Sequence, residues 1–490
     1  MSFRLLSIDE NPGGPDASTE RREARRIPIF PMEMPSTGHD SWTSVIVGRN
    51  GLGKSRALGG AARLFASLDM PSPRLAMSEA WKWRVSYLAN GSLCELWSGD
   101  RGYIFGSRDG VEVHPSELPR PRRVIALTNT VTDKFPLGDY SEEEAARSSY
   151  CYLGLRDRSG RASSTAVAIQ AIESLTVAAE YGTFQRARIV RIFSFLGYEP
   201  RIRHRYRWHY AIANAPRQPD EFRNWAQTSR AFSGHLSRLR QRLLLEPDLA
   251  ARLIRGIKAF EINQDSKSST LLTIDLSQSG GNSRESFEDI QFLKRQGLLR
   301  LRSVELKRVD SGVRVDLQET SSGELALATS FLALAANMDD ESLVLIDEPE
   351  VSLHPEWQSR YISLIADMFS EFAGGHFVIA THSPLIVSSV PEGAANVVSL
   401  DKSNPAEASG ESIDELLVTT FGVTTENNLY IKQKLIEALR LAADGKTKGE
   451  RFGSIITLLT SAVERLDAKS PVRSLVVDLA AVRDGKSNAS

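Results

Sequence analysis

The chain has 490 residues, of which 41% are hydrophobic and 25% are charged, and its formal net charge is −1. This length is enough for two or three domains, and the near-zero charge excludes a bulk electrostatic attraction to nucleic acid, so any basic surface has to be local. The two cysteines, Cys94 and Cys151, lack metal-binding spacing and indicate a reducing compartment without a disulfide framework. No signal peptide or bilayer-length apolar run is recognisable, so we expect a cytoplasmic protein.

A glycine-rich loop is the first motif along the chain. Residues 3–8 predict a strand, the polar stretch 11–26 predicts an exposed loop, and the β-branched run 43–47 predicts a strand leading into Gly48-Arg49-Asn50-Gly51-Leu52-Gly53-Lys54-Ser55. Glycines let such a loop turn tightly and point its N–H groups at nucleotide phosphates, with the N-terminus of the predicted helix 56–68 behind them. The alternative is a chance glycine-rich turn. The predicted phosphate-binding residues are Gly48, Asn50, Gly51, Gly53, Lys54 and Ser55, and Ser55 is also a predicted Mg²⁺ ligand.

Two further β segments follow. Residues 81–106 alternate polar and apolar side chains, with turn signals at Asn90-Gly91 and Gly99-Asp100, which predicts a hairpin-rich antiparallel sheet. The apolar run 124–127 predicts another strand.

An arginine-rich segment occupies the middle of the chain. Residues 183–255 contain fifteen arginines, five carboxylates and no lysine. The stretch 201–210 alternates with period two, which as a strand puts Arg201, Arg203, Arg205 and Arg207 on one face and Ile202, Tyr206, Trp208 and Tyr210 on the other. Residues 229–245 predict a helix with arginines between its apolar positions. The basic face suits nucleic-acid phosphates, a solvated surface or an acidic protein, and these alternatives stay open.

A serine-glycine motif precedes an apolar helix. Predicted strands at 304–306 and 313–315 lead to Thr320-Ser321-Ser322-Gly323-Glu324, and residues 325–336 predict the helix. Ser321 or Ser322 suits an N-cap, with Glu324 in the first turn. A helix N-terminus with a serine hydroxyl and a glycine also suits a γ-phosphate held by a second protomer.

Two carboxylates follow a run of four apolar residues, Leu343 to Ile346, which predicts a buried parallel strand that delivers acids to the carboxyl edge of a sheet. Asp347 suits the Mg²⁺ shell, and Glu348 suits a general base. Without the upstream loop, a core strand that ends in a solvated acidic turn would be the better interpretation.

A histidine follows the next predicted strand, 376–380. A lone histidine is more often structural, but His382 is expected at the same sheet edge as Glu348, where it suits a sensor of the γ-phosphate or the attacking water. A helix after Pro384, a strand near 397–400, a polar loop at 401–410 and a helical tail from Ile413, broken at 421–423, complete the chain.

In this order, the glycine-rich loop, S-S-G-E, D-E-P-E-x-x-L-H-P and T-H-S-P resemble an ABC-type ATPase head, and more narrowly the soluble branch with SMC, RecF and OLD proteins and the ATPase subunits of anti-phage systems such as Septu, retrons and PARIS. The resemblance implies an α/β fold with a mixed sheet, an antiparallel β-subdomain, a mainly helical insertion and a helical C-terminal tail. The expected regions are 1–150 and 301–400 for the head, 151–300 for the insertion and 401–490 for the tail.

The resemblance also implies roles for particular residues. Two heads would sandwich two ATP molecules with Mg²⁺, so that Ser321, Ser322, Gly323 and Glu324 act on the nucleotide of the other subunit. Glu348 would polarise the attacking water, His382 would sense the γ-phosphate, and the segment 350–354 would face the dimer partner. The glutamine-loop position is open between Asn129 and Asp133. The segment 152–161 resembles one in defence-associated ATPases.

Differences from the transporter signature, together with missing nuclease and coiled-coil patterns, reduce the number of functions to consider. The signature T-S-S-G-E differs from the transporter pattern L-S-G-G-Q, which argues against a transporter subunit. The hundred or so residues after His382 contain no D-x-D pair and no histidine, so we expect neither a Toprim nor an HNH nuclease centre, and no long heptad repeat indicates a coiled-coil arm.

Three functions remain open. The first is an ATPase whose nucleotide state controls a separate effector nuclease in anti-phage defence. The second is a RecF-like repair clamp that binds DNA directly through the basic insertion. The third is a scaffold in which ATP is structural and turnover is negligible.

Overall fold

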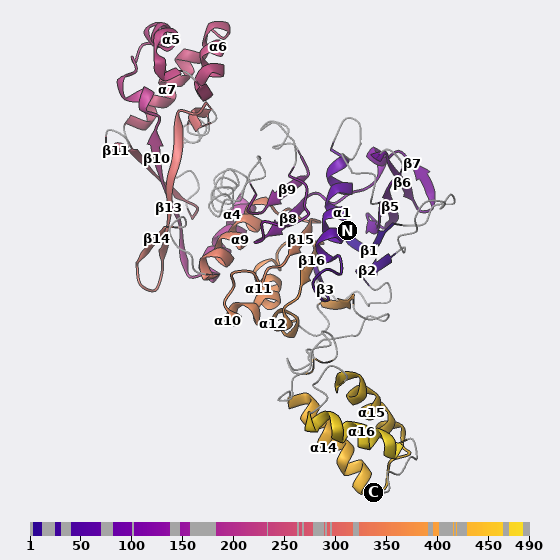
Figure 1. The fold of residues 1–490 in the computed structure, drawn as a ribbon. Coiled ribbons are helices and arrows are strands. Elements are labelled where there is room, and N and C mark those ends of the chain that lie inside the picture. Colours follow the sequence, from indigo (N-terminus) through magenta and orange to yellow (C-terminus); the bar gives the residue numbers. More distant parts are fainter. Residues whose placement is uncertain are drawn as a thin grey trace. The chain divides into compact units, whose positions relative to one another are not determined.

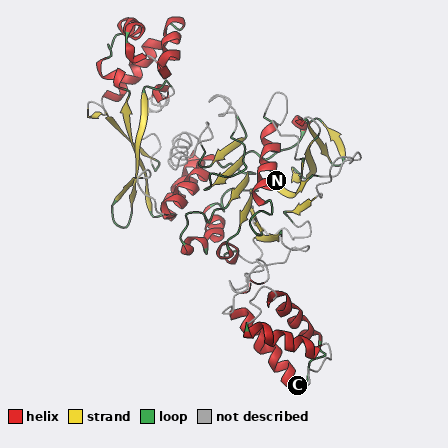
Figure 2. Ribbon diagram, in the orientation of Figure 1, coloured by secondary structure: helices red, strands yellow, loops and turns green. Residues whose placement is uncertain are grey.

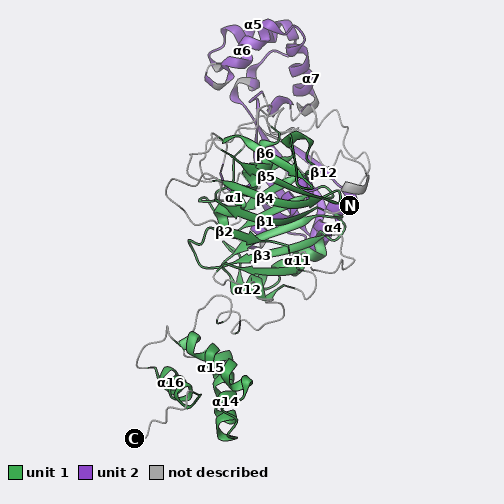
Figure 3. Ribbon diagram, turned by 90° about the vertical axis from the view of Figure 1, so that its right-hand side faces the viewer, with its two compact units in different colours: residues 1–152, 339–490 green, residues 153–338 purple. Residues whose placement is uncertain are grey.

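The structure is a computed structural model in which two compact units are distinguished, residues 1–152 with 339–490 and residues 153–338 (Figure 3). The described residues are 3–11, 25–30, 41–69, 82–99, 102–137, 148–156, 183–232, 234–261, 264–266, 269–277, 289, 292–294, 296–316, 323–390, 395–400, 415, 418, 429–463 and 470–483. No helix among them combines the length and apolar character needed to cross a membrane.

A mostly parallel sheet forms the centre of the first unit (Figures 1 and 2). Its strand order is β17 (Ala395–Ser399), β3 (Trp42–Val47), β16 (His376–Thr381), β15 (Leu343–Asp347), β8 (Val124–Thr128) and β9 (Tyr150–Leu153). The first five strands run parallel to one another. They are almost wholly buried and apolar, as expected for strands covered on both faces. Short helices follow β15 and β16, namely α10 (Pro355–Gln358), α11 (Tyr361–Met368) and α12 (Pro384–Ser388).

The same unit contains the predicted antiparallel sheet. Its strand order is β2 (Arg25–Pro28), β1 (Arg4–Glu10), β4 (Trp83–Ala89), β5 (Ser92–Ser98), β6 (Ile104–Arg108) and β7 (Val111–Val113), and the 3₁₀ turn η2 (Pro115–Glu117) follows. Asn90 and Gly91 connect β4 to β5 with φ angles of 53° and 79°. Two successive left-handed residues form the hairpin turn that this asparagine-glycine pair predicts.

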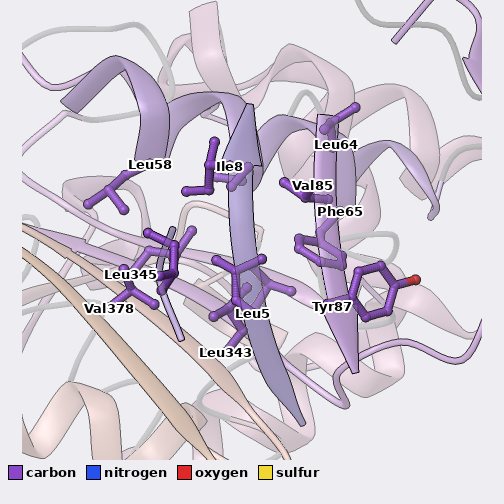
Figure 4. Packing of buried hydrophobic residues seen from close by; sticks show 14 of the residues in the cluster. Leu5, Ile8, Leu58, Leu64, Phe65, Val85, Tyr87, Leu343, Leu345 and Val378 are labelled. Atoms are coloured by element: carbon purple, nitrogen blue, oxygen red, sulfur yellow. The ribbon is translucent and has the colours of Figure 1, made fainter. Parts of the chain in front are cut away.

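Helix α1 (Lys54–Ser67) contacts strands of both sheets and joins their hydrophobic cores. Figure 4 shows the side chains that meet there, Leu58, Leu64 and Phe65 of α1, Leu5 and Ile8 of β1, Val85 and Tyr87 of β4, and Leu343, Leu345 and Val378 of the parallel sheet. Two glycines in α1 permit this close approach. A Cβ at Gly59 would lie 2.5 Å from the Lys134 carbonyl oxygen, and a Cβ at Gly60 would lie 2.3 Å from the Trp83 ring.

A buried histidine connects β16 to β1 of the antiparallel sheet and to its neighbour β3. The Leu5 N–H donates to His376 Nδ1 at 2.9 Å, and His376 Nε2 lies 3.0 Å from Ser44 Oγ. Because Nδ1 accepts a backbone proton, the ring is neutral and carries its own proton on Nε2. Burial, followed by the nearby charge of Arg4, holds the pKa of His376 well below its usual range.

Three helices form a separate core near the C-terminus. They are α14 (Leu429–Ala443), α15 (Glu450–Val463) and α16 (Pro471–Arg483), and their buried side chains include Phe452 and Val476. The predicted polar loop 401–410 and the break at 421–423 lie outside the described residues.

The second unit is built on an antiparallel sheet with helices at its ends (Figure 1). The strand order is β11 (Gln264–Ser266), β12 (Ser269–Asp275), β10 (Tyr198–Trp208), β13 (Leu299–Arg308) and β14 (Arg314–Asp316). Helices α5 (Pro219–Thr228), α6 (Ser237–Leu245) and α7 (Leu249–Glu261) share a core with one end of this sheet. Helix α4 (Thr183–Phe195) contacts both β10 and α9 (Gly323–Asn337). The arginine-rich segment therefore combines helices with a sheet, and the predicted helix 229–245 begins only at Ser237, after the short turns η4 (Arg230–Phe232) and η5 (Gly234–Leu236).

The alternation predicted for residues 201–210 is observed in β10 as far as Trp208. Ile202, Tyr206 and Trp208 are buried, and the arginines between them are at least partly exposed. The prediction is wrong for Tyr210, which is 69% exposed, because the strand ends at Trp208 and the chain enters the turn η3 (Tyr210–Asn214).

His204 shares the buried face of β10, and neither of its ring nitrogens has a hydrogen-bond partner among the described residues. Burial lowers its pKa to about 3.

We expect Gly60→Ala to lower the free energy of unfolding by about 1–3 kcal/mol, because the added methyl group overlaps a fully buried indole. Gly453 of α15 is the matched control, since a Cβ there meets nothing within 4 Å, and Gly453→Ala should stabilise the chain by about 0.5–1 kcal/mol. Urea unfolding of both variants measures the two effects, and equal shifts would contradict this account of α1 packing.

We expect His204 to make stability depend on pH. Its pKa is about 3 in the folded chain against an ordinary value of 6.5, so below pH 6.5 the unfolded chain takes up a proton that the folded chain excludes. The contribution of neutral, buried His204 to the free energy of unfolding is therefore complete above pH 6.5 and is lost as the pH falls toward 3. Between pH 7 and pH 5, the free energy of unfolding of His204→Leu, measured with urea, should therefore fall by about 2 kcal/mol less than that of the natural chain.

Candidate active site

Strand register brings three of the predicted motifs to one edge of the parallel sheet. Ala380 of β16 pairs with Asp347 of β15 on one side and with Ile46 of β3 on the other. In parallel strands the carboxyl ends leave the sheet at the same edge. Ile46, Ala380 and Asp347 therefore lie at one level of the sheet. The glycine-rich loop, the acidic turn and His382 each follow within two residues of it.

The glycine-rich loop turns through left-handed backbone. Gly51 has a φ of 87° and Gly53 a φ of 90°, a region where side chains are strained. Gly53 also caps α1, and a Cβ there would lie 2.8 Å from Arg56 Nη2. Arg56 is held in turn by Glu10, 3.1 Å away. The loop thus leads into the α1 N-terminus, whose free N–H groups favour an anion.

The Lys54 side chain folds back over this loop. Its Nζ donates to the carbonyl oxygens of Gly48 at 2.6 Å and Arg49 at 3.2 Å, and the residue is only 5% exposed. An ammonium group is therefore fixed at the loop, beside the N-terminus of α1.

Arg25 supports the loop from outside and was not predicted. Its guanidinium donates to the Leu52 carbonyl at 2.5 Å and to the Leu400 carbonyl at 3.0 Å, so it bridges the loop to the end of β17. The exposed loop predicted for residues 11–26 is wrong at its end, because Arg25 and Arg26 open strand β2. Residues 12–24 lie outside the described chain.

Ser55 joins the loop to the acidic strand, 292 residues away in sequence. Its hydroxyl donates to Asp347 Oδ1 at 3.0 Å. Asp347 is 1% exposed, and burial raises its pKa to about 7, with the nearby charges of Glu348, Asp133 and Glu350 acting in the same direction. No cationic side chain among the described residues forms an ion pair with it.

This arrangement fits Mg²⁺. A hydroxyl and a buried carboxylate provide hard oxygen donors, and a divalent cation would compensate the negative charge that burial disfavours. Within the described ranges no cluster of three or more His, Cys, Asp or Glu side chains could hold a metal. Mg²⁺ commonly binds through one or two carboxylates with water and substrate phosphates, so the limited donor set suits it.

The two candidates for the glutamine-loop position lie near this pair. Asn129 directly follows Thr128, which pairs with Asp347, and is half-buried. Asp133 is buried, and its two oxygens accept from the Phe135 N–H at 3.0 Å and the Tyr152 hydroxyl at 2.9 Å. The choice between them stays open.

Glu348 has an unusual backbone. Its φ is 49°, and its N–H donates to the Ala380 carbonyl at 2.9 Å. Left-handed backbone in a non-glycine residue costs free energy and occurs preferentially at functional sites. The β16 carbonyl thus holds the carboxylate-bearing residue directly after Asp347.

Glu350 anchors His382, a contact that was not predicted. Glu350 Oε1 accepts from Thr381 Oγ1 at 2.8 Å, from the His382 N–H at 2.7 Å and from His382 Nδ1 at 3.0 Å. The bond to Glu350 raises the pKa of His382 despite partial burial. Burial favours a higher pKa for Glu350, but the hydrogen bonds and charge of His382 outweigh it, so that its pKa is lowered. Residue spacing gives no signal for a pair 32 positions apart.

The turn after Glu350 is built by local bonds. Ser352 has a φ of 69°, and His354 caps α10 by accepting from the Glu356 N–H at 3.4 Å. Gln358 donates to the Leu353 carbonyl at 3.0 Å and accepts from Ser383 Oγ at 2.7 Å. Gln358 therefore connects the predicted dimer-facing segment to Ser383, the residue that follows His382.

The signature residues belong to the second unit. Gly323 begins α9, and Glu324 continues it, although the Glu324 side chain is not described. Ser321 and Ser322 lie outside the described residues. The helix predicted after this motif is observed, and its middle is almost wholly buried.

Three of the four predicted nucleic-acid-binding arginines have acidic neighbours. Arg201 bonds to Asp275 at 2.8 Å, while Arg203 and Arg205 lie 3.6 and 3.9 Å from Glu305. Only Arg207 of this set forms no ion pair with a described residue, and it is exposed. Ion pairing therefore leaves less free positive charge along the predicted arginine face than the sequence count indicates.

We expect Glu350→Gln to lower the pKa of His382, because the variant removes the negative charge that stabilises the imidazolium. An NMR pH titration of histidine-labelled protein, assigned with His382→Gln, measures the shift. Glu356→Gln removes an exposed carboxylate from the same segment and should leave the titration unchanged. An unchanged His382 titration in Glu350→Gln would contradict the pairing.

Sequence comparisons find local matches to known proteins. Residues 202–388 match the family described as "AAA domain, putative AbiEii toxin, Type IV TA system", a range that includes the acidic strand and His382 but not the glycine-rich loop. Protein ea59 of Escherichia phage lambda is 31% identical over 124 residues, which are 23% of this chain and 23% of the relative. The Septu protein PtuA of Bacillus mycoides (strain KBAB4) is 31% identical over 87 residues, which are 17% of this chain and 12% of the relative. The chain thus spans less than a quarter of the length of these relatives.

Solved structures give weak global similarity. An Smc head domain derived from Pyrococcus furiosus aligns with a TM-score of 0.32 and 14% identity, covering 83% of this chain and 95% of that one. A RecF–ATP structure aligns with a TM-score of 0.31 and 11% identity, covering 83% and 99%. These TM-scores carry no assignment by themselves. The sequence matches and the motif order make this chain resemble the soluble ABC-type ATPases, including those of anti-phage systems such as Septu.

Proposed function

We propose that this chain binds and hydrolyses ATP with Mg²⁺ and acts as the nucleotide-controlled regulatory subunit of an anti-phage defence complex. The contact of 3.0 Å between Ser55 and Asp347 carries the proposal, because it joins a phosphate-binding loop to a buried acid in the arrangement that nucleotide and metal require.

The phosphate-binding role rests on backbone geometry and charge. The loop from Gly48 to Gly53 and the N-terminus of α1 offer N–H groups to the phosphates, and Asn50 lies within this loop. Lys54 would exchange its bonds to the loop carbonyls for the β- and γ-phosphates. Ser55 and Asp347 would hold Mg²⁺, which neutralises charge on the transferred phosphoryl group.

Hydrolysis needs a base and a group that responds to the γ-phosphate. Glu348 follows the metal-binding acid at the sheet edge, where its carboxylate would orient and deprotonate water. The raised pKa of His382 favours its charged form, which suits an anionic phosphoryl group. Glu350 would act as a positioning residue, because one of its oxygens contacts the His382 imidazole and also accepts from the His382 N–H and the Thr381 hydroxyl.

A second copy of the chain would complete the site. In this arrangement Ser321, Ser322, Gly323 and Glu324 bind the γ-phosphate of the facing head, and the segment 350–354 lies at the dimer interface. ATP would favour the closed dimer, and hydrolysis would reopen it.

The defence role is the finer part of the proposal. Local similarity to PtuA supports it, and a separate effector nuclease is the expected partner, because we propose no nuclease centre in this chain. The second candidate is a RecF-like clamp that binds DNA directly, which the exposed Arg207 favours. The third candidate is an ATP-stabilised scaffold with negligible turnover. Kinetics distinguishes it from the ATPase switch, since replacing Glu348 would not affect the biological activity of a scaffold.

We expect Glu348→Gln to reduce ATP hydrolysis by about 100-fold or more, since it removes the proposed base while preserving side-chain size. In light scattering with ATP and Mg²⁺, the variant should also show a larger or more stable assembly than the natural chain, because bound ATP persists. Glu356→Gln is the control and should retain both turnover and nucleotide-dependent mass.

Two results would contradict different parts of the proposal. Unchanged hydrolysis in Glu348→Gln would show that Glu348 is not the general base. A monomer under every nucleotide condition would remove the roles given to Ser321 and Gly323 and favour the clamp.

A further inference from the structure

Three arginines lie at the end of the second unit's sheet whose strands share a core with helices α5 to α7, and Figure 1 shows these helices at that end of the ribbon. Arg207 of β10 and Arg300 of β13 are directly opposite in the strand register, and Arg302 lies two residues farther along β13. All three side chains are exposed. Like charges directly opposite each other destabilise a strand pair, so this arrangement has a standing electrostatic cost that a bound polyanion would relieve.

The opposite end of the same sheet provides the contrast. There Arg201 pairs with Asp275 at 2.8 Å, and Lys307 pairs with Glu199 at 2.6 Å. At Arg207, Arg300 and Arg302, by comparison, no ion pair or hydrogen bond to the side chain exists among the residues that the structure describes. Positive charge is therefore concentrated at one end of the ribbon rather than along the predicted arginine face.

An exposed aromatic residue stands at the same end. Tyr210 is 69% exposed, and its ring lies 4.3 Å from the His209 ring, centroid to centroid, at 39°. The His209 N–H donates to the Leu298 carbonyl at 2.8 Å, which holds this segment beside the start of β13. Tyr210 therefore lies close in the chain fold to both Arg207 and Arg300, instead of packing behind the strand.

We propose that Arg207, Arg300, Arg302 and Tyr210 form a binding site for single-stranded nucleic acid. Guanidinium groups bind phosphate oxygens in a bidentate manner. The register shift between the pairs Arg205–Ser303 and Tyr206–Leu301 leaves Arg302, two residues from Arg300, without a partner residue in β10. Unpaired bases stack on exposed aromatic rings, whereas the bases of a duplex are already stacked on one another and do not offer this contact. An acidic protein could also satisfy the arginines, and the polyglutamate competitor in the test distinguishes that partner from a single strand. The site does not depend on nucleotide hydrolysis.

The test is fluorescence anisotropy of the full chain with a labelled 20-nucleotide oligothymidylate, over a series of salt concentrations and without ATP. The triple variant Arg207→Gln, Arg300→Gln, Arg302→Gln should bind at least ten-fold more weakly. Its slope of log affinity against log salt should be smaller by about 2, since each phosphate contact on a single strand contributes about 0.7. Tyr210→Ala should weaken binding about ten-fold, and Tyr210→Phe should restore it.

Matched variants separate this site from general basic charge. The double variant Arg201→Gln, Arg203→Gln removes two ion-paired arginines and should change affinity less than two-fold. The triple variant should keep the natural ATPase rate and unfold at or above the natural temperature, because it removes the repulsion between Arg207 and Arg300, so its loss of binding is distinguishable from misfolding and from failure of the ATPase proposal.

Three outcomes would overturn the proposal. The double variant could weaken binding as much as the triple variant, or Tyr210→Ala could bind like the natural chain. A duplex of equal length, or polyglutamate of equal charge, could also compete as well as the unlabelled single strand.

Discussion

Parallel strand register is the constraint on which the candidate site depends. Backbone hydrogen bonds hold β16 between β3 and β15, so that Ile46, Ala380 and Asp347 share one level. The glycine-rich loop, the acidic turn and His382 then leave the sheet at the same edge, although Ser55 and Asp347 are 292 residues apart in the sequence. A one-residue slip in either strand pair would part Ser55 from Asp347, and a slip between β15 and β16 would also move the Ala380 carbonyl away from the Glu348 N–H. The buried apolar faces and the His376 network make such a slip costly.

Local patterns were sufficient to predict most of the head. The glycine-rich loop, the apolar run before Asp347 and the strand before His382 each contain their signal within about ten residues. Contacts between distant segments carried no such signal. Glu350 is distinguishable from other acidic turn residues only once the strands are paired, and Arg25 becomes a support for the loop only when β2 joins the antiparallel sheet. Sequence also could not fix a glutamine-loop residue, because Asn129 and Asp133 both follow β8 at the relevant edge.

The arginine-rich segment shows why charge counting has limited power. Fifteen arginines against five acids in 183–255 indicated a basic face, but the carboxylates that neutralise it, Asp275 and Glu305, come from strands later in the chain. Period-two alternation correctly assigned the buried and exposed sides of β10, yet it could not show where the strand would end. The end of the strand at Trp208 changes the surroundings of Tyr210 from protein interior to solvent.

The left-handed backbone at Glu348 limits which amino acids can occupy that position, separately from any catalytic need. Glycine, asparagine and aspartate tolerate this region, whereas β-branched residues strongly resist it. A valine or threonine there would damage the turn itself and could misplace Glu350 and His382 as well. Loss of function in such a variant would then reflect the geometry of the whole strand edge. The amino acids tolerated at residue 348 are therefore limited by two independent requirements, a carboxylate for the chemistry and a residue that accepts left-handed backbone.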